Sequence, residues 1–132
     1  MDYFIYKFNL SKKDEKRLLF LNNFYSEKFT SKTFLEKNLN KIFYFNGREA
    51  VIDIIYFKIF KSNKVDNRLI KLIEIFKVKK IPIMPLMANT LMEKYQVPEG
   101  SELGKKIKAI EEVWTNNNFH ISEKEIQKIV SN

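Results

Sequence analysis

Apolar residues recur at helical spacing along most of this 132-residue chain. Apolar side chains at i, i+3, i+4 and i+7 fall on one face of an α-helix, where they can pack against a neighbour. The pattern predicts helices that begin near Ser11, Ser31, Arg48, Asp66, Leu86, Ser101 and Ser122. The expected apolar faces include Leu35, Leu39 and Ile42 in the second helix and Leu103, Ile107, Ile110 and Trp114 in the sixth. We therefore expect an all-α fold of about six to seven helices.

Polar residues at the starts of these segments support the same interpretation. Ser11 and Ser122 are each followed three residues later by a carboxylate, the spacing of a capping box. Ser101 and Asp66 are expected to cap the helices that follow them. Gly47 is suited to end the second helix in a left-handed conformation, because glycine has no Cβ to clash there.

The segment at residues 48–61 is apolar on nearly every side. Its β-branched run at residues 51–55 would also suit a strand. We favour a central helix, because the flanking segments are helical and no partner strand is evident. Residues 51–59 are then expected to be deeply buried.

Composition narrows the class of protein. Apolar residues make up 45% of the chain, and only three Gly and three Pro punctuate it, which predicts one domain over residues 1–132 and argues against a many-stranded fold. The absence of Cys excludes disulfides and thiolate metal sites. No apolar run is long enough to cross a bilayer, and the start of the chain has no basic region typical of a signal peptide. We expect a cytoplasmic chain with no membrane partner and no cofactor.

The formal net charge of +8 has two explanations. Lysine and arginine that neutralise phosphates give salt-dependent affinity for nucleic acid. A/T-rich codon usage gives the same excess, because 21 of the 24 basic residues are Lys. The distribution favours the first explanation, since residues 58–80 hold eight basic residues against Asp66 and Glu74, a local charge of +6.

The most specific part of the sequence is IPIMPLMANTLMEKYQVPEGSELGKKIKAIEEVWTNNNF at residues 81–119. A connector with Pro82 and Pro85 leads to a short apolar helix, and a P-x-G-S turn leads to a helix with L-G in its first turn and E-E-x-W near its end. This order resembles the C-terminal end of the class II tRNA nucleotidyltransferases, the bacterial CCA-adding enzymes and poly(A) polymerases. Those proteins read P-x-x-P-L-x-G-x-D-L, then P-G-x-x-L/I-G-x-x-L, then E-x-x-W.

The resemblance extends upstream over most of the chain. Residues 46–53, NGREAVID, look like the G-R/K-E-x-x-x-D helix start of that family, and Leu10-Ser11 followed by Arg17-Leu18 looks like its L-S-x-x-x-x-x-R-L segment. The chain departs from the family where L-x-G-x-D-L is replaced by LMANTL, which puts Ala88 and Thr90 in place of the Gly and Asp. Such a change is typical of a gene fragment released from selection.

The resemblance implies a helical body without its catalytic head. The family's G-S turn, D-x-D metal pair and E-D-x-x-R nucleotide-reading motif do not occur here, so the chain alone is not expected to be an enzyme. The implied function is a non-catalytic C-terminal domain or remnant that holds tRNA or other structured RNA. As alternatives, the chain is a subunit that docks a separately encoded head, with the apolar run Tyr3-Phe4-Ile5-Tyr6 as the contact, or an unrelated helical interaction module.

Candidate RNA-binding residues fall in two places. One is the basic stretch with Lys71, Lys77, Lys79 and Lys80. The other is the start of the sixth helix, where free backbone N–H groups and the positive end of the helix dipole attract phosphate. Its candidate residues are Ser101, Gly104, Lys105 and Lys106.

Other chemistry has ordinary structural explanations. Adjacent acidic residues such as Glu111 and Glu112 point about 100° apart on a helix, which indicates solvated faces rather than a metal pair. His120 is the only histidine and has no partner residues in a catalytic arrangement. Trp114 lies on an apolar face, which favours a core residue over a platform for stacked bases.

Overall fold

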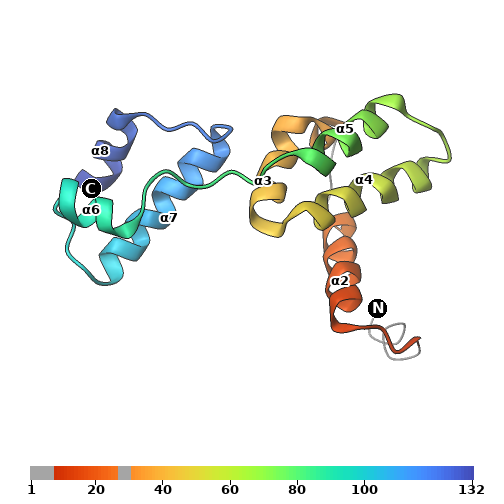
Figure 1. Cartoon of the computed structure of the whole chain (residues 1–132), viewed down its shortest axis with the longest axis horizontal. Helices are drawn as coiled ribbons and strands as arrows, with labels where there is room; N and C mark the ends of the chain where they lie inside the picture. Colours follow the sequence, from red (N-terminus) through yellow and green to blue (C-terminus); the bar gives the residue numbers. More distant parts are fainter. Residues whose placement is uncertain (1–7, 27–30) are drawn as a thin grey trace. The chain divides into compact units, whose positions relative to one another are not determined.

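The computed structural model describes residues 8–26 and 31–132, which form helices joined by loops (Figure 1). The segment Tyr3 to Tyr6, considered above as a docking contact, lies outside the described residues. Over the described residues there are seven α-helices, one 3-10 helix and no strand, which confirms the predicted all-α fold. Their bounds are α2 (Lys12–Ser26), η1 (Ser31–Phe34), α3 (Glu36–Asn46), α4 (Arg48–Ser62), α5 (Asn67–Val78), α6 (Ala88–Lys94), α7 (Ser101–Asn116) and α8 (Glu123–Ser131).

The chain divides into two compact units, residues 1–81 and residues 82–132, here called unit 1 and unit 2. Unit 1 contains α2 to α5, and unit 2 contains α6 to α8. The sequence predicted one domain, and whether the two units fold as one stays a prediction. Each unit has its own cluster of buried apolar residues.

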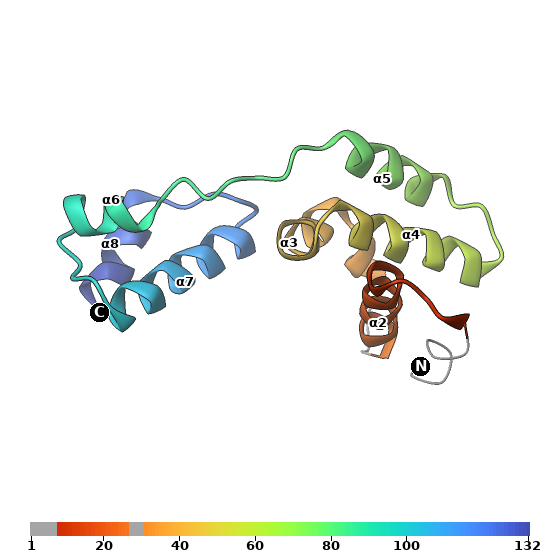
Figure 2. The ribbon, with the colours of Figure 1, turned by 60° about the horizontal axis from the view of Figure 1, so that its bottom comes forward.

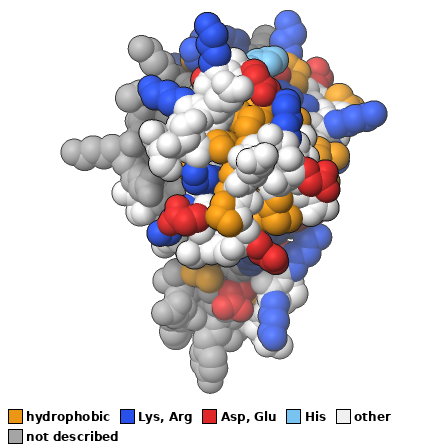
Figure 3. All heavy atoms as spheres, turned by 90° about the vertical axis from the view of Figure 1, so that its left-hand side faces the viewer, with side chains coloured by type: hydrophobic (Ala, Val, Ile, Leu, Met, Phe, Trp, Pro, Cys, Tyr) orange, Lys and Arg blue, Asp and Glu red, His pale blue; other side chains and the backbone are white. Residues whose placement is uncertain are grey.

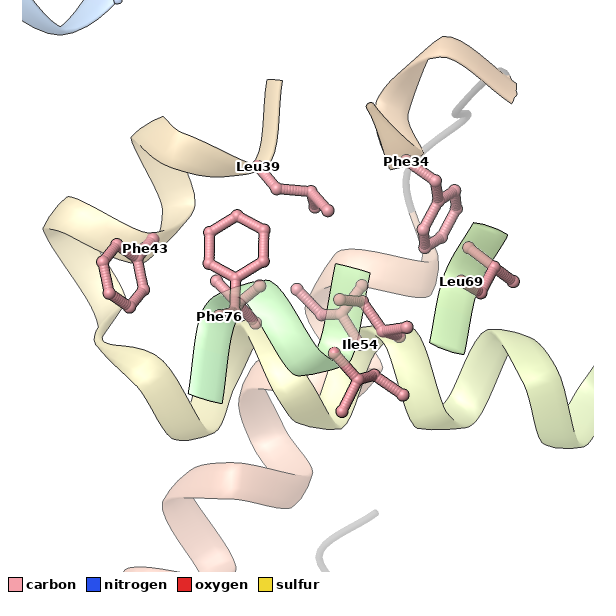
Figure 4. Close-up of a cluster of buried hydrophobic side chains, with 9 residues drawn as sticks. Phe34, Leu39, Phe43, Ile54, Leu69 and Phe76 are labelled. Atoms are coloured by element: carbon pink, nitrogen blue, oxygen red, sulfur yellow. The ribbon is translucent and has the colours of Figure 1, made fainter. Parts of the chain in front are cut away.

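Helix α4 is the centre of unit 1. It contacts α2, α3 and α5, and α5 runs antiparallel beside it (Figures 1 and 2). The close-up in Figure 4 shows the buried side chains that these helices enclose. The rings of Phe43 and Phe76 meet edge to face, with centroids 5.2 Å apart, and both side chains are fully buried. Because each ring buries a large apolar area, aromatic packing of this kind contributes strongly to the stability of unit 1.

Arginines tie the helices of unit 1 together. Arg17 of α2 donates to both carboxylate oxygens of Asp53 of α4 at 2.8 Å, in a bidentate pair. Hydrogen bonding to Asp53 is the main cause that raises the pKa of Arg17 above its ordinary value. Arg48 donates to the carbonyls of Phe76 and Lys79, two of the groups that the end of α5 leaves without a helical partner.

The central helix is confirmed, but its deep burial is not. Val51, Ile54 and Ile55 are fully buried, as expected. On the other side of α4, however, Tyr56 is 50% exposed and Phe60 is 83% exposed. Hydrophobicity alone could not separate a buried face from an apolar face that lacks a covering element.

The second predicted helix is broken near its start. Residues 31–34 form η1, and Leu35 has extended backbone angles (φ −90°, ψ 144°) before α3 begins at Glu36. Leu35 is 46% exposed, and its neighbour Phe34 occupies the core at 7% exposure. The expected face of Leu35, Leu39 and Ile42 is therefore wrong at its first position, because the break shifts the helical register.

Gly47 and Gly100 hold the N-cap positions of α4 and α7. Their backbones lie at φ 90°, ψ 175° and φ 135°, ψ −161°, a region that is essentially restricted to glycine. Gly47 ends α3, as predicted, but the predicted left-handed conformation is wrong, because its ψ of 175° is extended. The predicted cap at Ser101 is wrong, since Gly100 holds the cap position of α7 and no side chain caps the helix.

Unit 2 packs α6 and α8 against α7. Its core is mainly aliphatic and consists of Leu91, Val97, Leu103, Ile110 and Ile126. Trp114 is 3% exposed, with its ring centroid 5.0 Å from that of Phe119, which confirms it as a core residue. The predicted capping box of Ser122 and Glu125 is present at the start of α8.

The connector before α6 has no regular secondary structure between Lys79 and Met87. Met87 holds the cap position of α6 and offers no side-chain hydrogen bond, so no side chain caps the start of α6. Thr90, where the resemblance expects an Asp, lies in the first turn of this helix. Over the described part of the chain, no helix is long and apolar enough to cross a membrane.

Candidate nucleic-acid interface

The predicted lysines of unit 1 differ in what their side chains do. Lys71, Lys77 and Lys80 are exposed on or just after α5. Lys79 instead turns inward, where its Nζ lies 2.9 Å from Glu36 Oε1 and 2.6 Å from Asn40 Oδ1. Lys79 therefore fastens the end of α5 to α3 and is unsuited to a simple phosphate contact.

The residues at the start of α7 are similarly divided. Lys106 Nζ donates to the carbonyl of Val130, which joins α7 to the end of α8. Lys105 is exposed and lies 3.5 Å from Glu102, one turn earlier on the same helix. An exposed pair of this kind holds its partners weakly, so Lys105 can exchange Glu102 for a phosphate.

Gly104 does not pack closely against another element. A Cβ built at this position meets no atom within 4 Å, and the residue has no positive φ. Ser101 is also exposed, in the first position of α7. The structure thus leaves the start of α7 open to solvent, but it places no buried polar group there to define a ligand.

The two predicted groups of lysines lie in different units, with Lys71, Lys77 and Lys80 in unit 1 and Lys105 in unit 2. On the face drawn in Figure 3, lysine and arginine side chains alternate with carboxylates and apolar groups rather than forming an unbroken basic field. Of the two candidates, residues 58–80 hold the larger basic excess, a local charge of +6.

Two open grooves lie beside α2 and α4 in unit 1, and the sequence did not predict either. One, of about 300 Å³, is lined by Lys13, Lys16, Arg17, Phe20, Phe45, Asn46, Glu49 and Ala50. Its charges are largely matched, because Lys13 lies 3.0 Å from Glu49 and Arg17 binds Asp53. The other, of about 440 Å³, is lined by Leu21, Asp53, Tyr56, Phe57, Ile59 and Phe60.

An exposed polar cluster lies in unit 2, where the Tyr95 hydroxyl donates to Glu123 and Lys94 Nζ lies 3.2 Å from the same carboxylate. These hydrogen bonds lower the pKa of Glu123 and raise the pKa values of Tyr95 and Lys94. The cluster joins α6 to α8 and has no second acid or nucleophile in it. The cluster is an exposed set of hydrogen bonds that connects two helices.

No constellation typical of catalysis is evident in the described ranges, 8–26 and 31–132. No group of three or more His, Asp or Glu side chains there is placed to hold a metal ion. His120 is exposed at the end of the loop before α8.

Comparison with known proteins adds no relative. No protein-family model, curated protein or solved structure matches the chain.

Proposed function

We propose that this chain is a non-catalytic helical module that binds structured RNA, with tRNA as the expected ligand. The exposed lysines of α5 carry this proposal. Lys71, Lys77 and Lys80 point into solvent within a stretch of local charge +6, and such lysines bind phosphates through counterion release.

The resemblance to the body of class II tRNA nucleotidyltransferases supports the choice of ligand. Its two upstream motifs, L-S-x-x-x-x-x-R-L and G-R-E-x-x-x-D, meet in space through the pair of Arg17 and Asp53. The Arg48 of the second motif caps α5, the helix that presents Lys71 and Lys77. The motif residues thus link α2 to α4 and link α4 to α5, the helix that carries the exposed lysines.

Binding of a fluorescently labelled tRNA transcript to the full chain, followed by anisotropy over a series of salt concentrations, tests the proposal. We expect weak binding at low salt and a steep loss of affinity as salt rises. The double variant Lys77→Glu/Lys80→Glu is expected to bind less tightly and to lower the salt slope by about 0.7–0.9 for each phosphate that is no longer neutralised. Lys79→Glu is unsuitable, because it breaks the hydrogen bonds with Glu36 and Asn40.

Lys12→Glu is the matched control, since Lys12 is exposed at the start of α2 and the change suits the positive end of that helix. An equal loss of affinity in this control would mean nonspecific attraction to the net charge. Absence of binding at low salt would reject the proposal. Incorporation of labelled CTP or ATP into tRNA by the pure chain would show that it is not a purely binding module.

A docking subunit for a separate catalytic head is the second candidate function. It requires an exposed apolar surface, and the described residues contain one on α4, at Tyr56, Phe57 and Phe60.

A further inference from the structure

The apolar face that α4 leaves uncovered is the most unusual surface of unit 1. Tyr56, Phe57 and Phe60 are 50%, 38% and 83% exposed and follow one another at i, i+1 and i+4, on one side of the helix. Large aromatic side chains grouped in solvent reduce solubility and commonly mark a site of interaction. These side chains border the 440 Å³ groove, to which α2 contributes Leu21.

The chemistry of this groove suits apolar side chains. Four of its six lining residues, Leu21, Phe57, Ile59 and Phe60, have no polar side-chain atom. Asp53 also lines it, but both of its carboxylate oxygens accept from Arg17. The Tyr56 hydroxyl is then the one polar side-chain group left for a ligand among the lining residues, which is too little to read the edges of nucleic-acid bases.

One lysine borders the groove. Residues 54–65 contain no carboxylate, and of their lysines Lys58 lies on the other side of α4, with its Nζ 5.5 Å from the ring centroid of the core residue Phe34. Lys61 Nζ lies 5.9 Å from the ring centroid of Phe57 and 5.8 Å from that of Tyr25, so this cation borders the aromatic face. A complementary ligand therefore combines apolar side chains with negative charge beside them.

We propose that the groove between α2 and the C-terminal half of α4 is a docking site for an amphipathic helix of a partner protein, with carboxylates bordering its apolar face. Helices commonly bind by laying apolar residues at i, i+3, i+4 and i+7 into a groove formed by other helices. Lys61 at the border favours an acidic helix and disfavours a second copy of this chain, whose own Lys61 would face it. The inference stands independently of RNA binding by α5.

The test uses the full chain and a synthetic fluorescein-labelled peptide of about 15 residues, with Leu at helical spacing and Glu on both borders of the Leu face. A second peptide has Lys in place of every Glu. Anisotropy titrations are expected to show binding of the Glu peptide at least about tenfold tighter than that of the Lys peptide. Equal affinity for the two peptides would overturn the proposed charge selection, and no binding of either would overturn the site.

Phe60→Ser tests the location. We expect it to weaken binding of the Glu peptide by about tenfold or more, because an aromatic anchor is removed. Val78→Ser is the matched control, since Val78 is 80% exposed near the end of α5, away from the groove lining. Both variants are expected to keep the wild-type circular dichroism spectrum, and an equal loss of affinity in both would reject the groove as the site.

Lys61→Glu tests the rim. It is expected to weaken binding of the Glu peptide and strengthen that of the Lys peptide, whereas Lys124→Glu, at an exposed position of α8, leaves both unchanged. Binding of phosphatidylserine vesicles and of an oligouridylate is measured in the same way. The proposal would be overturned if the chain bound the vesicles or the oligouridylate but neither peptide, and if Phe60→Ser abolished that binding. The surface would then be assigned to a membrane or to RNA. Loss of tRNA binding in the Lys77→Glu/Lys80→Glu variant, with the Glu peptide still bound, would separate the two functions.

Discussion

Units 1 and 2 reach stability by different means. Unit 1 encloses large aromatic side chains and fixes its helices with Arg17 and Arg48, whose partners lie 36 and 28 residues away in the sequence. Unit 2 encloses mainly aliphatic side chains in about 50 residues, a size at which a core alone is marginal. All three arginines of the chain belong to unit 1. Two of them stabilise the fold, so the proposed RNA binding rests on lysines and on Arg68, whose side chain is 92% exposed.

The variant with the largest expected effect on the free energy of unfolding tests whether the two units unfold separately. Phe43→Ala removes a fully buried ring from unit 1 and is expected to cost about 3–5 kcal/mol. Trp114 is the only tryptophan and reports on unit 2. Because each unit encloses its own buried apolar cluster, we expect helical circular dichroism to decrease at lower denaturant concentration while Trp114 fluorescence keeps its wild-type midpoint. Coincident shifts of both signals would show one cooperative domain.

The pair of Arg17 and Asp53 is expected to give an asymmetric result. The Asp53 side chain is 14% exposed and that of Arg17 is 41% exposed. Loss of the partner therefore leaves a larger uncompensated desolvation cost at Asp53 than at Arg17. Arg17→Ala is expected to lower the free energy of unfolding by about 2–3 kcal/mol, and Asp53→Ala by less. Denaturant titration measures both, with Glu49→Ala as the control for a surface pair worth about 1 kcal/mol or less. The reverse order would mean that burial of Asp53 does not decide the strength of the joint between α2 and α4.

Gly47 and Gly100 hold the N-cap positions of α4 and α7, so the same substitution can be made in both units. Gly47→Ala and Gly100→Ala force a Cβ into backbone angles that only glycine adopts readily, and each is expected to cost about 1–3 kcal/mol. Space does not limit either substitution, since a Cβ meets no atom within 4 Å at either position. Denaturant titrations that follow Trp114 and helical signal separately are expected to place each loss in its own unit.

A pH titration probes the aromatic side of unit 1. Burial raises the pKa of Tyr25 to about 12, and its hydroxyl donates to the carbonyl of Ile54 at 2.7 Å. Because the folded state retains this proton more strongly than the unfolded state, the stabilisation is complete below about pH 10 and is lost as pH rises from about 10 to about 12. Tyr25→Phe is expected to cost about 1 kcal/mol at neutral pH and to flatten this part of the stability curve. An unchanged slope in the variant would assign the alkaline loss to other groups.

The smallest effect is a gain in unit 2. Gly104 lies inside α7 without a positive φ, and a Cβ there meets open space. Gly104→Ala is therefore expected to raise the stability of unit 2 by about 0.5–1 kcal/mol, measured by Trp114 fluorescence in denaturant. If the variant also binds tRNA less tightly, Gly104 contributes to a close approach of ligand to the helix start. Unchanged binding would leave it no role in RNA recognition.

Periodicity was sufficient for the helices because it averages over many residues. It predicted the apolar face of α7 and favoured a helix at α4 despite the β-branched residues there. It failed where one residue decides the outcome. Leu35 leaves the core because a single extended residue separates η1 from α3, and Ser101 loses the cap because Gly100 adopts the required backbone angles.

The candidate site was less accessible to sequence reasoning. Lysines look alike in a sequence, yet Lys79 and Lys106 bind groups within the protein while Lys77 and Lys80 are exposed. The pair of Arg17 and Asp53 does have a signal in the sequence. Asp53 is the one carboxylate within an otherwise apolar stretch of α4, and a carboxylate so placed needs a cation from another element.

The connector with Pro82 and Pro85 has a consequence for avidity. If both units bind RNA, then after one unit has bound a long RNA the other meets the same molecule at an effective concentration set by the connector rather than by the solution. Proline restricts the backbone and reduces the number of conformations over which the tethered unit is diluted. Lysines that bind RNA too weakly from one unit then act together. Cleavage of the connector would remove that gain while leaving every binding surface intact.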